Sequence, residues 1–436
     1  MTAMPGIIIL CQLFHEIHPC AGVVEEQMHV LICNPGLTFQ SDAPLITRLR
    51  ARAIQETGIE VMIMGYLPSF AAEFGRHGLP YTSVETGLNP KTRLRFATWK
   101  KRLGNYWIFI AEPAIVIWQA LRYAANHAVD VIYMSHPEPW LVLACWLLFP
   151  RRSKLHLVAL IPLAFRRDPN SMRGFSLPSK FRWVLNTWAC RFLPRFIHLI
   201  CDNRHVPSVM GIARWPSVHV VPEGHRDLIS STNTVEARQR LGIPVDQRML
   251  LMFGVASPVK GADLLLKVLE NVEPSFNVFI VGQTGGVYQS NWGNPERLYQ
   301  SGWKDHLFIV ARHVSNEEMN DYFSACDAII LPYRKGYETT SANLRQAIER
   351  GKAILASDQY CLGDTVRNYR LGLLFPPGNA EALRDCLLEF AGKPDAWFDA
   401  VRKQCAVMNR DYDWQTIGRQ YTEVFNSILR MDLKRQ

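Results

Sequence analysis

Short apolar runs alternate with segments of amphipathic helical spacing along most of the chain. A continuous apolar run bounded by Gly, Pro, Asn or Asp is typical of a strand that is buried on both faces of a parallel sheet. The alternation predicts helices such as Pro44–Glu56 and Ala114–Asn126 between such strands. The first series of strands is expected at His29–Asn34, Glu60–Gly65, Val131–Met134, Leu155–Ile161, Ile197–Cys201 and Val218–Val221.

A second series of the same kind begins after Glu223-Gly224, with helices expected at Ala262–Glu270, Asn316–Ala325 and Ala380–Ala391. Because strands and helices alternate, each series predicts a doubly wound α/β domain with helices on both faces of a parallel sheet. The second series of strands is expected at Met249–Phe253, Asn277–Val281, Leu307–Val310, Ala328–Leu331, Ala353–Ala356 and Leu373–Phe375.

The polar segment Ser230–Thr234 marks the boundary between the domains, residues 28–229 and 230–411, and amphipathic spacing continues to Leu433. Residues 1–27 are interpreted as an extension or a mis-assigned start, because Met28 opens the first strand and no basic region precedes the apolar run near the N-terminus. His15, His18 and Cys20 lie in this stretch without a fourth ligand at fitting spacing, so no metal site is expected.

The composition of the 436-residue chain is that of a globular protein, with 48% hydrophobic and 20% charged residues. The formal net charge of +9 suits an anionic partner. The ten Cys are scattered without a Cys-x-x-Cys pair, which favours a reduced, cytoplasmic protein. The longest apolar segment, Trp140–Pro150, is shorter than the roughly 18–20 residues that crossing a membrane requires. We expect it to form a buried helix beside the first sheet.

The segment from Ala328 to Asp358 carries the most specific pattern in the chain. Its apolar run Ala328–Leu331 predicts a buried strand, a small polar loop follows, and a helix is expected to begin near Ser341. The loop therefore lies at the carboxyl edge of a parallel sheet, where open α/β sheets bind ligands. The start of the helix, at Thr340, Ser341 and Ala342, offers free backbone N–H groups to a phosphate.

This segment resembles the donor-site signature of the retaining GT-B glycosyltransferases of family 4 (group 1). In that family a Glu, seven residues and a second Glu precede an Ala-rich helix. Glu338 occupies the first position, and Gln346 stands where the family has the second Glu. The resemblance implies two Rossmann-like domains that face a cleft, and a final helix, residues 412–436, that returns to the first domain. It also implies that Glu338 binds the donor sugar's hydroxyls during catalysis, whereas Gln346 faces the ribose with an amide in place of a carboxylate.

The Gly-rich turn that precedes Lys260 resembles the family's second signature, which ends in Lys-Gly. The resemblance implies that Lys260 is a catalytic cation reaching the donor's pyrophosphate, with Gly254 and Ser257 in the donor-binding turn. A compact ammonium neutralises the charge that develops on the departing nucleoside diphosphate. The family's Arg, five or six residues before this Lys, is missing here. Either another cation such as Lys335 or Arg334 replaces it, or the activity is weakened.

Further site residues are implied at other strand ends. Gly282, after the second strand of the second domain, allows the backbone to approach the donor closely. Arg312 or His313, after the third strand, is expected to flank the base. In the first domain the resemblance implies that His136 lies near the sugar or the acceptor, and a loop-packing role for this His is equally open. A further His that the family often has after the next strand is absent from this chain.

Basic residues with interleaved aromatic rings cluster at Lys91–Phe109 and Arg182–Arg195. Such segments suit the headgroup layer of an anionic membrane, so we expect reversible peripheral contact at the inner face of the membrane. Contact with an anionic acceptor, or a merely solvated surface, would explain the same pattern. No nucleic-acid partner is expected, because no nucleic-acid motif accompanies the charge.

The sequence therefore predicts a GT-B glycosyltransferase that moves a sugar from a nucleoside-diphosphate sugar to an acceptor hydroxyl, with retention. The donor is a co-substrate, and neither a cofactor nor a metal is expected. The expected acceptor is a lipid-linked saccharide or a growing surface polysaccharide. Two alternatives stay open: a degenerate GT-B scaffold or binding subunit, favoured by Gln346 and the missing Arg, and a GT-B sugar-nucleotide epimerase.

Overall fold

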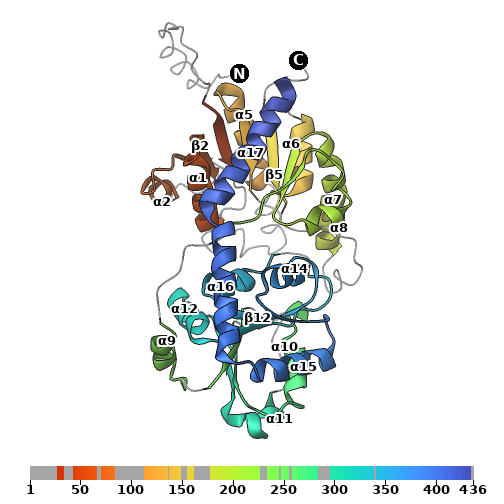
Figure 1. Ribbon diagram of the computed structural model, residues 1–436. Coiled ribbons are helices and arrows are strands. Elements are labelled where there is room, and N and C mark those ends of the chain that lie inside the picture. Colours follow the sequence, from red (N-terminus) through yellow and green to blue (C-terminus); the bar gives the residue numbers. More distant parts are fainter. Residues whose placement is uncertain are drawn as a thin grey trace, which may run out of the picture.

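Two parallel sheets, each in its own half of the molecule, form the framework of the protein in the computed structural model (Figure 1). The first is seven-stranded with the order β3-β2-β1-β4-β5-β6-β7, and the second is six-stranded with the order β10-β9-β8-β11-β12-β13. The prediction of two α/β domains is confirmed. The structure describes residues 27–33, 43–65, 70–83, 112–135, 137–148, 155–161, 177–225, 233–244, 247–254, 258–282, 295–337 and 340–433.

The first sheet is parallel throughout, and its strand order reverses direction between β1 and β4. Val30 of β1 pairs with Val61 of β2 on one side and with Val131 of β4 on the other. Its strands are β1 (His29–Cys33), β2 (Glu60–Gly65), β3 (Tyr81–Ser83), β4 (Val131–Met134), β5 (His156–Leu160), β6 (His198–Cys201) and β7 (Val218–Val220). Its helices are α1 (Ala43–Gln55), α2 (Phe70–Gly75), α5 (Glu112–Asn126), α6 (Pro139–Leu148), α7 (Leu177–Phe192) and α8 (His205–Met210).

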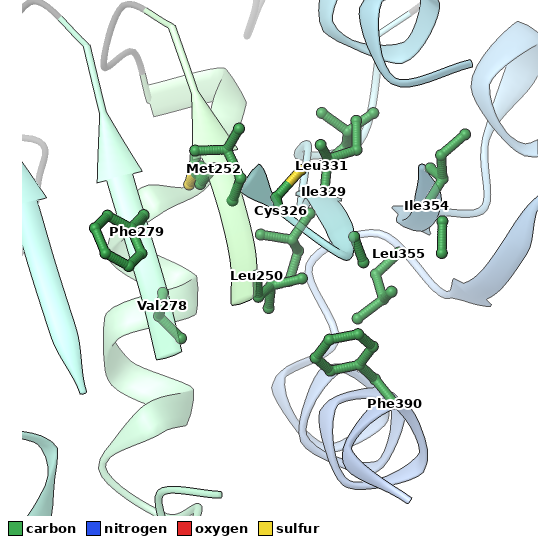
Figure 2. Packing of buried hydrophobic residues seen from close by; sticks show 14 of the residues in the cluster. Leu250, Met252, Val278, Phe279, Cys326, Ile329, Leu331, Ile354, Leu355 and Phe390 are labelled. Atoms are coloured by element: carbon green, nitrogen blue, oxygen red, sulfur yellow. The ribbon is translucent and has the colours of Figure 1, made fainter. Parts of the chain in front are cut away.

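The second sheet is built in the same way around the central strands β8 and β11. Figure 2 shows how Leu250, Ile329 and Leu355 from three adjacent strands share one apolar cluster with Phe390 of a covering helix. The strands are β8 (Met249–Phe253), β9 (Asn277–Val281), β10 (Leu307–Val310), β11 (Ala328–Leu331), β12 (Ala353–Ser357) and β13 (Gly372–Phe375). The helices are α9 (Thr234–Leu241), α10 (Ala262–Leu269), α11 (Glu296–Tyr299), α12 (Asn316–Ala325), α13 (Ala342–Glu349), α14 (Tyr360–Tyr369), α15 (Ala380–Ala391) and α16 (Asp395–Asp411).

The last helix, α17 (Trp414–Leu433), leaves the second half of the molecule and runs along the first (Figure 1). Its Tyr421 hydroxyl lies 3.3 Å from that of Tyr133 on β4, and the Arg50 guanidinium sits 5.6 Å from both ring centres. Gly418 passes so close to α1 that a Cβ there would lie 2.4 Å from the carbonyl oxygen of Ala53. The end of the chain therefore adds its apolar face to the core of the first domain. The domain limits at residues 229 and 411 remain predictions.

The observed strands follow the predicted ones closely, since most apolar runs coincide with a strand or differ from it by one or two residues at its ends. The short edge strand β3 was not predicted, because its residues are at least partly exposed and form no apolar run. The predicted buried helix near Trp140 is α6, whose Leu141, Val142 and Leu143 lie in the core. Among the described residues, no helix is both long and apolar enough to cross a membrane.

Candidate active site

Two glycines bring the ends of adjacent strands together at the carboxyl edge of the second sheet. Gly254 follows β8 with φ +109°, and a Cβ there would lie 2.7 Å from the Lys260 Nζ. Gly282 follows β9, and a Cβ there would lie 2.0 Å from the Gly254 carbonyl oxygen. A side chain at either position would force its neighbours apart. The structure thus places the predicted residues Gly254, Gly282 and Lys260 side by side.

Lys260 ends a short 3-10 turn, Pro258–Lys260, just before α10. Burial lowers the pKa of its ammonium from the ordinary value, because desolvation disfavours the charged form. Within the described part of the chain, no hydrogen-bond or ion-pair partner accompanies this ammonium. A half-buried cation without a carboxylate partner is an unfavourable arrangement that a bound anion would relieve.

The start of α13 is fixed at the same edge of the sheet. Ser341 is its N-cap, and the Ser341 Oγ accepts a hydrogen bond of 3.3 Å from the Leu344 backbone N–H. The buried Tyr333 hydroxyl lies 3.1 Å from the same Oγ, and burial raises the pKa of that phenol, which keeps it neutral. The Asn343 side-chain amide donates to the carbonyl of Phe253 at the end of β8. The free backbone N–H groups of the helix, beginning at Ala342, therefore lie beside the turn that carries Lys260.

Gln359 braces the loop that leads from β11 toward α13, and its role was not foreseen. Its Nε2 donates to the carbonyl oxygens of Tyr333 and Arg334, each at 3.0 Å. Its Oε1 accepts from the backbone N–H groups of Gly336 at 3.0 Å and Tyr337 at 3.3 Å. A glutamine before a helix gives no sequence signal for such a role, because its partners are more than twenty residues away in the chain.

Gln346 lies on α13 with its side chain buried, and its Oε1 accepts a hydrogen bond of 2.6 Å from Arg350. Arg350 also donates to Asn320 on α12, at 2.8 Å from its second terminal nitrogen. The acceptor that was expected to face a ribose is thus held by an internal cation. The ribose contact stays a prediction, and it requires Arg350 to share or release that oxygen.

Two of the other predicted cations at this edge, Arg312 and Arg334, are paired. Arg312, after β10, is exposed and binds Glu318 on α12 with an NH1–Oε2 distance of 3.0 Å. Arg334 binds Asp263 in the first turn of α10. As a substitute for the missing motif Arg, Arg334 would first have to leave Asp263, whereas Lys335 is exposed.

Three predicted site residues, His136, Ser257 and Glu338, lie outside the described residues, so their roles remain predictions. The segment Lys91–Phe109, expected at a membrane, also lies outside. The described neighbours of Glu338, which are Tyr337 and Thr340, belong to the loop at the sheet edge already described.

A cavity of about 550 Å³ lies between the two domains and reaches the Thr340–Ser341 loop. Polar groups from both domains line it, including Asp202, whose importance was not recognised in the sequence. The only sequence feature that could have pointed to Asp202 is its place directly after an apolar run, at the carboxyl end of a strand. The lining consists of Asp202, Asn203, Arg204, His205, Val220, Pro222, Glu223, Thr340, Ser341, Leu344, Arg345, Cys361, Asp364, Thr365, Asn368, Tyr369, Met408, Asp411, Tyr412 and Gln420.

Most of the second domain matches a known protein family. Residues 233–396 match the model of the family described as glycosyl transferases group 1. A D-inositol 3-phosphate glycosyltransferase of Streptomyces scabiei is 28% identical over 203 residues, which are 44% of this chain and 44% of the relative. A glycogen synthase of Lachnoclostridium phytofermentans is 24% identical over 205 residues, covering 44% of this chain and 41% of the relative. The chain thus spans less than half of the curated relatives that it matches.

Solved structures match both domains. A sucrose-phosphate synthase from Thermosynechococcus elongatus superposes with a TM-score of 0.63 at 16% identity, covering 93% of this chain and all of that one. The Anabaena protein Alr3699/HepE in complex with UDP gives a TM-score of 0.64 at 16% identity, over 92% of this chain and 100% of that one. These likenesses confirm the predicted GT-B arrangement of two Rossmann-like domains.

Proposed function

We propose that this protein is a glycosyltransferase that moves a sugar from a nucleoside-diphosphate sugar to an acceptor hydroxyl. The observation that carries the proposal is the half-buried Lys260 ammonium, which has no partner among the described residues and lies beside Gly254 and the start of α13. A cation and a helix N-terminus that converge on one strand edge suit a diphosphate. The match of residues 233–396 to the group 1 glycosyl transferases supports the same function, because this stretch contains Gly254, Lys260 and the start of α13.

The groups at this edge would act on the leaving diphosphate rather than attack the sugar. When the bond between the sugar and the diphosphate breaks, negative charge grows on the departing phosphate oxygens. The Lys260 ammonium and the first N–H groups of α13 would stabilise that charge without rearrangement, because Asn343 and Ser341 already fix the helix start. Glu338 would hold the sugar's hydroxyls. In this proposal transfer proceeds with retention and needs no protein nucleophile.

A uridine diphosphate sugar is the first donor to test. The Anabaena protein of the same fold has been solved with UDP and with UDP-glucose. The names of the relatives point to saccharides or inositol phosphate as acceptors in those proteins. For this chain we propose a saccharide acceptor, either lipid-linked or part of a surface polysaccharide.

We also propose peripheral contact with an anionic membrane through α7. Phe181, Val184 and Trp188 are exposed by 64%, 38% and 53%, and their spacing places them on one face of the helix. Arg191 and Arg195 are exposed near the end of this face. Aromatic rings beside cations suit the headgroup layer of a membrane.

A scaffold without catalysis is the second candidate function. It is favoured by Gln346, whose side-chain carbonyl oxygen is held by Arg350. A scaffold would bind a nucleotide weakly or not at all and would not cleave the donor to nucleoside diphosphate.

Turnover decides between the two functions. Purified protein is incubated with UDP-sugars, with and without saccharide acceptors, and nucleoside diphosphate release is measured together with the product. We expect release that falls 100-fold or more in Lys260→Met, since one preorganised donor is worth about 10²–10³ in rate. Lys267→Met, on the exposed face of α10, is the matched control and should keep full activity. Absence of donor turnover and of nucleotide binding in the wild-type protein would contradict the proposed function.

A further inference from the structure

A carboxylate of the first domain reaches the donor loop of the second. The Thr340 Oγ1 donates a hydrogen bond of 2.6 Å to the Asp202 Oδ2, which follows β6. The other oxygen, Oδ1, accepts from the Asn203 side-chain amide at 2.9 Å. Asp202 is only 5% exposed, so this contact is shielded from water. Thr340 is the residue directly before the N-cap of α13.

A second contact holds the same helix one turn further on. Arg345 on α13 binds Glu223, which follows β7, with an NH2–Oε1 distance of 2.7 Å. The two side chains are 11% and 12% exposed. The start of α13 is therefore attached to the first domain at two places, through the ends of two adjacent strands of the first sheet.

The opposite side of α13 faces the proposed diphosphate site. Asn343 and Arg345 are two residues apart, which separates their side chains by about 200° around a helix. Asn343 is bound to the carbonyl of Phe253, next to Gly254 and Lys260, whereas Arg345 points to the first domain. A displacement of the first domain would thus be transmitted to the helix start that faces the donor.

We infer that Asp202 and Glu223 are positioning residues, which set the place of the donor-binding helix start through Thr340 and Arg345. The inference rests on the proposed function and adds to it. The first domain, besides binding the acceptor, completes the geometry of the donor site in the second domain. Productive alignment of the diphosphate then depends on the approach of the two domains.

A double-mutant cycle on Asp202 and Thr340 tests the inference. Asp202→Ala and Thr340→Val each remove the hydrogen bond, and each should lower kcat at least 10-fold while the KM for the donor changes less than 3-fold. The double variant should be no worse than the more impaired single variant, because both act through one contact. Asp202→Asn and Thr340→Ser retain an acceptor and a donor, and they should restore most of kcat.

Arg204→Ala is the control for a general loosening of the domain boundary. Arg204 also crosses the boundary, but its ion pair is with Asp364 on α14 rather than with a residue of α13. Its removal should leave kcat within 2-fold of wild type. The inference is overturned if the losses in Asp202→Ala and Thr340→Val multiply, if kcat stays within 2-fold in both, or if Arg204→Ala causes an equal loss.

Urea unfolding of the same variants separates this inference from the proposed function. In one outcome, the unfolding midpoints show coupling between Asp202 and Thr340, and the wild type turns over no donor. The contact would then only stabilise the structure, and both the catalytic inference and the proposed function would be overturned. Normal turnover in the wild type without kinetic coupling in the cycle would overturn the inference alone.

Discussion

Replacing Gly254 with Ala should displace Lys260 and thereby weaken donor binding. The added Cβ would lie 2.7 Å from the Lys260 Nζ and 3.4 Å from the Asn343 Nδ2. Because the ammonium is the far end of a flexible side chain, it can move away. Ordinary contact begins at 3.4 Å, so the displacement is at least 0.7 Å (3.4 minus 2.7).

The effects on stability and on function should differ in size. The backbone at Gly254 has φ +109°, and holding a residue with a Cβ there costs about 1–3 kcal/mol of folding free energy. Misplacement of a catalytic group by about 1 Å can cost on the order of 10²-fold in rate. We therefore expect kcat/KM for the donor to fall 30- to 100-fold, in a protein that still unfolds cooperatively.

Gly378→Ala is the matched control. Gly378 has φ +79°, and a Cβ there meets nothing within 4 Å. This variant should lose a similar amount of stability, measured by urea unfolding, and keep its donor kinetics. If Gly254→Ala keeps kcat/KM and the affinity for nucleoside diphosphate within 2-fold of wild type, or if Gly378→Ala loses as much activity, displacement of Lys260 is not what impairs the enzyme.

Three further predictions concern other parts of the molecule. Arg345→Ala removes the largely buried Arg345–Glu223 ion pair and should lower the free energy of unfolding in urea by about 2–4 kcal/mol. Arg402→Ala, at a surface pair with Asp399, should lower it by less than about 1 kcal/mol. Equal losses would contradict the buried character of the first pair. Burial raises the pKa of Asp202 from 3.8 to about 6, so its ionisation opposes folding, and stability from this group falls as pH rises from about 4 to 6. Asp202→Asn should therefore be more stable than wild type by up to about 3 kcal/mol at pH 7 and equal to it near pH 4. A gain in stability that does not depend on pH would contradict the raised pKa of Asp202. The double variant Phe181→Ser, Trp188→Ser should bind anionic vesicles about 10-fold more weakly, or weaker still, than the wild type. Leu388→Ser, at an exposed site on α15, should bind as the wild type does. Equal binding by the two variants would show that α7 does not contact the membrane.

The central strands could be predicted because they are largely buried on both faces and therefore mostly apolar. Ala328–Leu331 and Met249–Phe253 are examples in which the apolar run and the strand coincide. The edge strand Tyr81–Ser83 could not be found in this way, because an edge strand needs no continuous apolar run.

The local part of the site was predictable for a related reason. Gly254, Lys260 and Ser341 each follow a buried strand closely in the sequence, and parallel strands bring their carboxyl ends to one edge. Their sequence spacing alone therefore indicates that they lie close together.

The contacts between domains could not be predicted. Asp202 and Thr340 are 138 residues apart, and no periodic pattern links them. The pairing of Arg334 with Asp263 lies within the second domain, but it was not foreseen either, because the two residues are 71 positions apart in the chain. Contacts between domains depend on how the two domains meet, and Asp202 alone is an ordinary polar residue at a strand end.

A crystal structure of the protein with a bound nucleoside diphosphate is the most direct test of the proposed donor site. We expect the diphosphate oxygens to lie within hydrogen-bond distance of the Lys260 Nζ and of the first backbone N–H groups of α13, next to Gly254. A diphosphate bound instead in the cavity between Arg204 and Asp364, away from Lys260, would contradict the proposed donor site.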